Sequence, residues 1–201
     1  MDMKFRLSGL LLLFIAAIAT QKSFAYNSQY ELTITNLTRA SLFTPFIASS
    51  HSTKTPFFEV GLPATAALAA LAEGGDTTPL ENYLLAQANT VDTTTGSGLL
   101  GPGETVVLMI NAGYRAKRIN LASMILPTND AFLALNAVKA PRGRRAVTYW
   151  VPAYDAGSES NNELCTSIPG PTCGGVGESP EDEGEGFIHI HSGIHGHGDL
   201  S

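Results

Sequence analysis

Short segments of alternating apolar and polar residues, separated by turn-forming residues, recur along this 201-residue chain. The first, YELTITN at 30–36, has apolar side chains at every second position and is rich in β-forming residues. This period of two is typical of a strand that is buried on one face. Other segments with strand composition are 42–49, 104–111, 120–126, 131–138, 146–151 and 187–191. Strands at intervals of roughly 10–15 residues, joined by Gly, Pro and Asp turns, predict an all-β fold, an antiparallel β-sandwich.

One stretch of different composition interrupts this pattern. Residues 63–73 read PATAALAALAE, and two glycines, Gly74 and Gly75, follow. A proline near the start and a glycine just past the end are typical of a short helix. Residues 78–88 are a second candidate helix. The β-sandwich is therefore expected to contain one or two short inserted helices.

The N-terminus has the pattern of a secretory signal peptide. Lys4 and Arg6 precede the apolar run 7–19, and small residues follow at Ser23 and Ala25. A basic segment, a short apolar core and a small-x-small ending are the parts of such a peptide. The apolar run is shorter than the roughly 20 residues of a membrane span. We therefore expect a signal peptide at 1–25, one domain at 26–201, a secreted or periplasmic location and no stable membrane insertion after cleavage.

The charge of the chain is acidic and unevenly distributed. The formal net charge is −6, and it becomes −8 without residues 1–25, which carry three bases and one acid. This balance argues against nucleic acid as a partner. Bases gather near the turn Arg142–Arg145, which could contact a sulfated or acidic glycan or be an ordinary solvated hairpin. No Lys or Arg follows Arg145, and residues 174–186 form an acidic, glycine-rich loop.

The chain contains two cysteines, Cys165 and Cys173. In an exported protein, two cysteines eight residues apart predict a local disulfide. The intervening IPGPT turns readily. The alternative is a reactive or metal-binding pair, although the spacing matches neither a CxxC motif nor a zinc knuckle.

The stretch 153–163, AYDAGSESNNE, holds many oxygen-bearing side chains with little apolar material. Asp155 and Glu159 lie on either side of Gly157, and glycine tolerates the sharp turn that would direct both carboxylates to one ion. Asp130, just before the strand at 131–138, could supply a third carboxylate. Calcium prefers six to eight oxygen ligands of these kinds. The alternative is that these residues cap backbone amides in turns.

Four histidines follow within nine residues near the C-terminus. His189 and His191 share one face of the expected strand, and His195 lies just beyond a Ser-Gly turn. Such a group could bind zinc, copper or nickel, or it could be a hydrogen-bonded structural set. No arrangement of nucleophile and base is evident, so the chain is not expected to be an enzyme.

Several segments together resemble bacterial spondin-domain proteins, which are related to the N-terminal domain of F-spondin. They are 30–39, 61–64 with 70–76, 126–133, 153–163 and 184–196. The resemblance covers the whole of 26–201 in matching order. It implies a C2-like β-sandwich that binds calcium in loops at one end. It places the calcium ligands of the family on Asp130, Asp155 and Glu159, with Glu159 where the animal proteins have Asp.

These observations lead to two expectations of function, and the alternative to both is a purely structural extracellular module with no ion. The first is an exported, calcium-binding, spondin-like module for extracellular or periplasmic binding or adhesion, with an unidentified glycan, protein or matrix component as its partner. The second is a transition-metal-binding protein or metalloenzyme centred on His189, His191 and His195.

Overall fold

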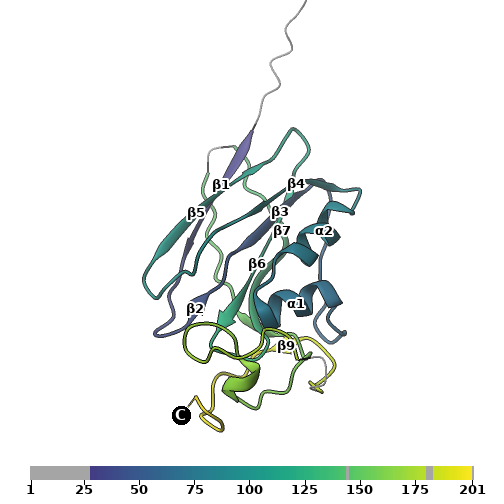
Figure 1. The fold of residues 1–201 in the computed structure, drawn as a ribbon. Helices are drawn as coiled ribbons and strands as arrows, with labels where there is room; N and C mark the ends of the chain where they lie inside the picture. Colours follow the sequence, from purple (N-terminus) through teal and green to yellow (C-terminus); the bar gives the residue numbers. More distant parts are fainter. Residues whose placement is uncertain (1–27, 144, 180–182, 201) are drawn as a thin grey trace, which may run out of the picture.

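The computed structural model describes residues 28–143, 145–179 and 183–200, and the expected signal peptide lies outside them. The described chain forms two antiparallel β-sheets with two short helices, which confirms the expected all-β sandwich (Figure 1). No helix in these residues is long and apolar enough to cross a membrane.

The larger sheet has seven strands in the order β4-β3-β6-β7-β8-β9, with β2 paired to β6. Its strands are β2 (Leu42–Phe43), β3 (Ile47–His51), β4 (Thr90–Thr95), β6 (Arg118–Leu126), β7 (Ala131–Lys139), β8 (Ala153–Asp155) and β9 (His189–Ile190). The smaller sheet pairs β1 (Gln29–Thr35) with β5 (Thr105–Asn111).

The two expected helices are present. Helix α1 spans Ala66–Gly74, and the side chain of Thr65 caps its first turn by accepting from the Leu68 N–H. The helix ends at Gly75, whose φ of 69° is a left-handed conformation that glycine adopts without strain. Helix α2 spans Thr78–Leu85 and has proline in its first turn.

The helices cover one face of the larger sheet, and β1 and β5 cover the other. Along β7, Phe132 and Ala134 belong to the core under the helices, whereas Leu133 belongs to the core between the sheets. In the neighbouring strand β6, Ala122 and Leu121 divide in the same way. The central strands are therefore buried on both faces, because side chains alternate across a strand.

One strand assigned from the sequence is wrong, and one strand of the structure was not predicted. The segment 146–151 forms no strand, although its composition is typical of one, and Trp150 is 81% exposed. Strand β8 takes the place beside β7 instead, at Ala153–Asp155. Strand β4, which is mostly threonine, was missed because it has no apolar alternation.

The two ends of the sandwich differ in charge. Strands β6 and β7 pair Arg118 with Lys139 at one end, near Arg145, and we call this the basic end. The opposite end carries the β6–β7 turn, Asp130 and the end of β8, and we call it the loop end. The chain after β8, shown yellow-green to yellow, lies at the loop end (Figure 1).

Candidate cation site at the loop end

The three predicted oxygen ligands all lie at the loop end, in the turn before β7 and in the stretch that ends and follows β8. Asp130 immediately precedes β7 and Asp155 ends β8, and the two strands pair Ala131 with Asp155. Gly157 then turns the chain with a φ of 66°, and Glu159 follows. Asp130, Asp155 and Glu159 are all fully buried. Buried carboxylates are rare in proteins unless they are paired or bind a cation.

Asp130 has one satisfied and one unsatisfied carboxylate oxygen. Its Oδ2 accepts hydrogen bonds from the backbone N–H groups of Ser158 at 2.8 Å and Glu159 at 3.1 Å. Its Oδ1 has no hydrogen-bond partner among the described residues. Burial and the nearby charge of Asp155 raise the pKa of Asp130 to about 7, against the lowering effect of the two N–H groups. An ionised Asp130 is therefore costly unless a cation lies beside it.

Asp155 also belongs to a second group of ligands. One ligand atom each from Asp155, Glu185 and His189 lies within 4.8 Å of the other two. His189 Nε2 is 3.5 Å from Asp155 Oδ1 and 3.8 Å from Glu185 Oε2. The Nδ2 group of Asn161 donates to both carboxylates, at 2.8 Å to Asp155 and 3.1 Å to Glu185. These three side chains could hold a metal ion. Asp130 and Glu159 lie outside this group.

His189 is oriented as metal-binding histidines often are. Its Nδ1 lies 3.0 Å from the backbone carbonyl oxygen of Ile190, so an Nδ1–H donates there and the Nε2 lone pair faces the two carboxylates. Burial lowers the pKa of His189, but the Ile190 carbonyl and the charges of Asp155 and Glu185 outweigh it and raise the pKa overall. Without a metal, the imidazole is therefore biased towards its protonated form.

The other predicted histidine ligands make local contacts. His191 Nδ1 accepts from the Gly193 N–H at 3.0 Å, and His195 Nε2 lies 3.0 Å from the Ser192 hydroxyl. Burial lowers the pKa of His191. Neither His191 nor His195 belongs to the ligand group around Asp155. The structure thus brings one of the three predicted histidines to that group.

Two acidic residues at this end were not predicted as site residues. Glu185 lies in the acidic, glycine-rich stretch, where its spacing of four from His189 was the available indication. Glu163 accepts from the backbone N–H groups of His195 and, at 2.7 Å, His197. The His195 N–H contributes most to lowering the pKa of Glu163. Glu163 therefore anchors the C-terminal segment as a carboxylate.

The disulfide between Cys165 and Cys173 is present, as predicted. It closes the loop that follows the oxygen-rich stretch, next to the short 3-10 helix Cys165–Ser167. Beyond it, the N–H of Cys165 donates to Asp199 Oδ2 at 2.8 Å. Covalent and hydrogen-bonded links therefore hold the segments that surround the candidate ligands.

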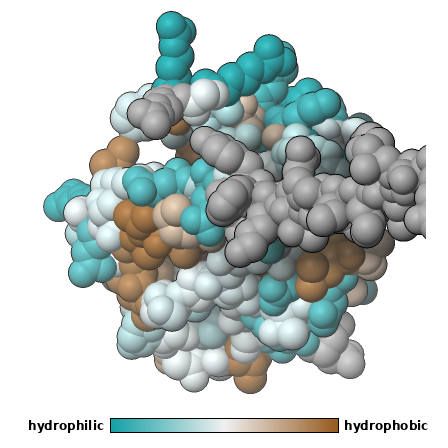
Figure 2. Space-filling view, turned by 90° about the horizontal axis from the view of Figure 1, so that it is seen from above, coloured by the Kyte–Doolittle hydropathy of each residue, from teal (hydrophilic) through white to brown (hydrophobic). Residues whose placement is uncertain are grey.

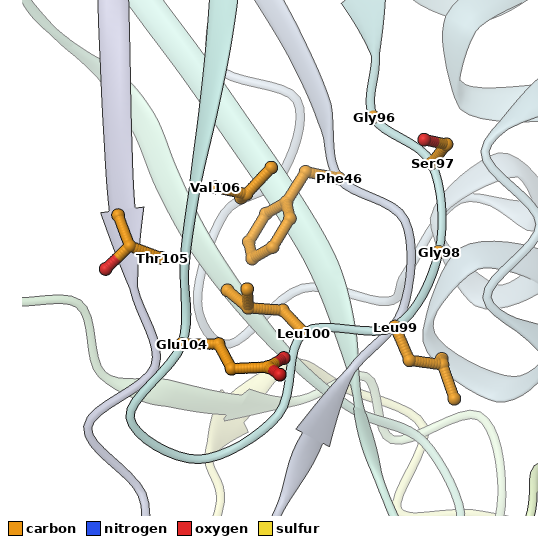
Figure 3. Close-up of a pocket in the computed structure, with 9 residues that line it drawn as sticks. All are labelled: Phe46, Gly96, Ser97, Gly98, Leu99, Leu100, Glu104, Thr105 and Val106. Atoms are coloured by element: carbon orange, nitrogen blue, oxygen red, sulfur yellow. The ribbon is translucent and has the colours of Figure 1, made fainter.

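A cavity of about 380 Å³ beside β5 is not a comparable site (Figure 3). The side chains of Phe46, Leu100 and Val106 point towards one another there, and the nearby carboxylate is that of Glu104. This carboxylate already accepts from the Gly101 N–H at 2.7 Å, so it stabilises a turn. No second charged side chain lines this cavity.

Comparisons with known proteins do not assign the chain to a family. No family model matches it. No curated protein is significantly similar to it.

Proposed function

We propose that this chain is an exported, calcium-binding, spondin-like β-sandwich. In this proposal, calcium is held by Asp130, Asp155 and Glu159 and orders the loop end, which binds a partner outside the cell or in the periplasm. The ion has a structural role and no catalytic one. The partner is a glycan, a protein or a matrix component.

One observation carries the proposal, the environment of Asp130. The side chain is fully buried, its Oδ1 has no hydrogen-bond partner among the described residues, and Asp155 adds a second negative charge nearby. A bound cation would satisfy the oxygen and balance both charges. For Asp155, the ion pair found in the described chain is with His189 alone, so no Lys or Arg side chain there balances its charge.

The chemistry of these ligands favours calcium over softer metals. Asp130, Asp155 and Glu159 offer hard carboxylate oxygens, and Ser158 and Asn161 add hydroxyl and amide groups to the same loop. Calcium takes many oxygen ligands in flexible geometry, which suits a loop better than the strict octahedron of magnesium.

The expectations of export and of a spondin-like identity rest on the sequence. The N-terminal pattern of a signal peptide and a local disulfide agree with an oxidising compartment. The resemblance to spondin domains places calcium ligands on the same three carboxylates that the fold buries at the loop end.

Thermal unfolding with and without calcium tests this proposal. Calcium at about 100 times its Kd should stabilise the protein by about 2.7 kcal/mol, which corresponds to a Tm gain of roughly 5–10 °C. Asp155→Asn should abolish the gain. Asp76→Asn is the matched control, because the exposed Asp76 belongs to neither ligand set and accepts from the Thr78 N–H, an acceptor that asparagine preserves. A wild-type Tm that calcium does not change would contradict the proposal.

A second candidate function is transition-metal binding, favoured by the group of Asp155, Glu185 and His189. One imidazole and two carboxylates with atoms within 4.8 Å of one another are a ligand set that zinc accepts. The Ile190 carbonyl already orients the imidazole for this role. The set differs from the predicted trio of histidines in having Asp155 and Glu185 where His191 and His195 were expected.

Metal analysis of untagged protein separates the two candidates. If zinc binds here, purified protein should contain it stoichiometrically, and His189→Ala should remove it while leaving any calcium-dependent Tm gain. Asp130→Asn should abolish the calcium-dependent Tm gain and leave the zinc content unchanged. His191→Ala is the matched control, since His191 lies outside the ligand group. Metal content that His189→Ala does not change would exclude this second site.

A further inference from the structure

An apolar groove runs along the open side of the sandwich, and none of the candidate ligands at the loop end lines it. It encloses about 880 Å³ between strand β1 and the segment 146–151. We call it the side groove. Its floor consists of apolar side chains from both sheets: Leu32, Ile34, Phe43, Ile119, Leu121, Leu133, Leu135 and Val138. The groove therefore opens into the core between the two sheets.

One wall of the side groove is the unpaired edge of β1. Every residue from Gln29 to Thr35 lines the groove, and β1 pairs with β5 alone in the described chain. Ser28 accepts from the Ala112 N–H in the extension of the β1–β5 register. In an antiparallel pair, alternate residues exchange hydrogen bonds, so the even-numbered residues of β1 face β5. The backbone groups of the odd-numbered residues, Thr33 among them, therefore face the side groove.

The opposite wall is a second stretch of backbone without strand partners in the described chain. Residues 146–151 belong to no sheet in the described chain. The hydroxyl of Tyr149 donates to the backbone carbonyl of Lys139 at 2.8 Å, which attaches this wall to β7. Trp150 is 81% exposed on the same wall. An unpaired strand edge and an unpaired backbone segment thus flank one apolar groove.

The groove has positive charge at one end. Lys139 and Arg145 line it at the basic end of the molecule, where Arg142 is also exposed. Seen from above, the surface of the molecule shows hydrophobic patches among hydrophilic side chains (Figure 2). Glu31 is the one acidic side chain among the residues that line the groove, so Lys139 and Arg145 outnumber it there, although the chain as a whole is acidic. They favour a ligand with negative charge at one end.

We propose that the side groove binds an extended, acidic-ended peptide segment of a partner protein, which adds a strand to β1. The added backbone pairs with the outward-facing groups of the odd-numbered residues of β1. Alternate apolar side chains enter the groove, and carboxylates meet Lys139 and Arg145. This is strand addition at a sheet edge, where main-chain hydrogen bonds give affinity and side-chain pockets give specificity.

The two backbone walls favour a peptide over a lipid-like anion. A fatty acid would use the apolar floor and the bases but would leave the backbone groups of β1 unpaired. A peptide strand satisfies all three features. Antiparallel addition directs its C-terminus towards the basic end, since β1 begins there. Acidic residues are therefore expected at the C-terminal end of the bound segment.

Fluorescence of Trp150 provides a direct test, because it is the single tryptophan of the chain. The probe is the peptide Val-Thr-Val-Thr-Val-Thr-Val-Glu-Asp, titrated into the full mature chain. Binding should shift the emission to the blue and weaken with added salt. The peptide with Glu-Asp moved to its N-terminus should bind less tightly. Absence of any saturable shift with either peptide would overturn the proposal.

Variants of β1 separate strand addition from simple apolar binding. Thr33→Pro removes an N–H that faces the groove and none that faces β5, and proline is tolerated at such an edge. It should weaken binding about tenfold, as the loss of a hydrogen bond implies. Thr33→Ala retains the N–H and should bind like the wild type. Equal affinity of the proline and alanine variants would overturn the proposal.

Charge variants give a test that does not depend on how Thr33→Pro folds. Arg145→Glu should weaken the probe and remove most of its salt dependence. Lys54→Glu is the matched control, a base that does not line the groove.

Two results would identify another occupant of the groove. If dodecanoate shifts the Trp150 emission and the peptide does not, the groove is an amphiphile site. If the protein alone is a dimer that Thr33→Pro makes monomeric, a second copy occupies the groove. Either result would overturn a partner peptide.

Discussion

At the scale of single residues, Asp130 is the side chain whose environment is least explained by folding alone. Its Oδ2 is well satisfied by two backbone N–H groups, yet its Oδ1 has no partner among the described residues and Asp155 lies close by. Burial of a charge in this way opposes folding. A buried carboxylate of this kind is expected where a bound ligand supplies the missing interaction.

Asp130→Asn should therefore stabilise the ion-free protein at pH 8. The pKa of Asp130 is raised from 3.8 to about 7, so the folded state holds a proton that the unfolded state releases between these values. This contribution to stability is present below pH 3.8 and lost as the pH rises through 7. At pH 8 the variant should gain on the order of a few kcal/mol over the wild type, and at pH 4.5 the difference should shrink.

Urea unfolding in EDTA at the two pH values measures this difference. Asp76→Asn, which removes an exposed carboxylate, should show no comparable gain. The same Asp130→Asn variant should lose the calcium-dependent rise in Tm. An asparagine variant that is less stable than the wild type at pH 8 would show that the carboxylate is compensated within the chain.

His51 is also a buried titratable residue, but unlike Asp130 it has hydrogen-bond partners within the chain. It is fully buried, and its Nε2 lies 2.6 Å from the Ser49 hydroxyl and 2.9 Å from Asn120 Nδ2. Burial lowers its pKa. The imidazole is thus a satisfied neutral member of the core, consistent with the absence of any functional indication around it in the sequence.

At the scale of elements, the sequence predicts strands well where one face is apolar. The β1 alternation is reproduced residue by residue, with Tyr30, Leu32 and Ile34 packed against the core. The prediction fails where a segment has the composition of a strand but has no strand beside it to pair with. The segment 146–151 reads as a strand, yet it forms a wall of the side groove, because β8 pairs with β7 and no layer covers Trp150.

For the two helices, the sequence predicts that they exist but not where they pack. Their existence follows from alanine, leucine, proline and glycine at fixed positions, and both are present. Their place could not be predicted in this way. That α1 and α2 cover the outer face of the larger sheet depends on Phe132 and Ala134 facing them across β7, which is a tertiary relation. The double burial of β6 and β7 follows from it.

At the scale of the whole molecule, the candidate sites lie at separate places on one sandwich. Asp130, Asp155 and Glu159 could be grouped from the sequence because two of them share a loop and the third precedes a strand. Glu185 could not, because its approach to Asp155 depends on β9 pairing with β8. The loop end is therefore assembled from the β6–β7 turn, the stretch after β8 and the segment before β9.

The assembly of the loop end can be tested with two glycines that share a φ of 66°. An added Cβ at Gly157 would lie 2.4 Å from the backbone oxygen of Phe187, whereas one at Gly143, towards the basic end, would meet nothing within 4 Å. Gly143→Ala should cost only the strain of a left-handed residue, about 1–2 kcal/mol. Gly157→Ala adds a clash with backbone, typically about 1–3 kcal/mol more.

Thermal unfolding of the two variants should therefore show a lower Tm for Gly157→Ala, by roughly 2–4 °C for each additional kcal/mol. Because Gly157 lies between Asp155 and Glu159, this variant should also lose the calcium-dependent gain, which Gly143→Ala should keep. The shared φ makes the cost of a left-handed residue comparable in both, so a larger loss for Gly157→Ala reports the contact with Phe187. Equal Tm values would mean that the segment before β9 does not lie against the turn at Gly157.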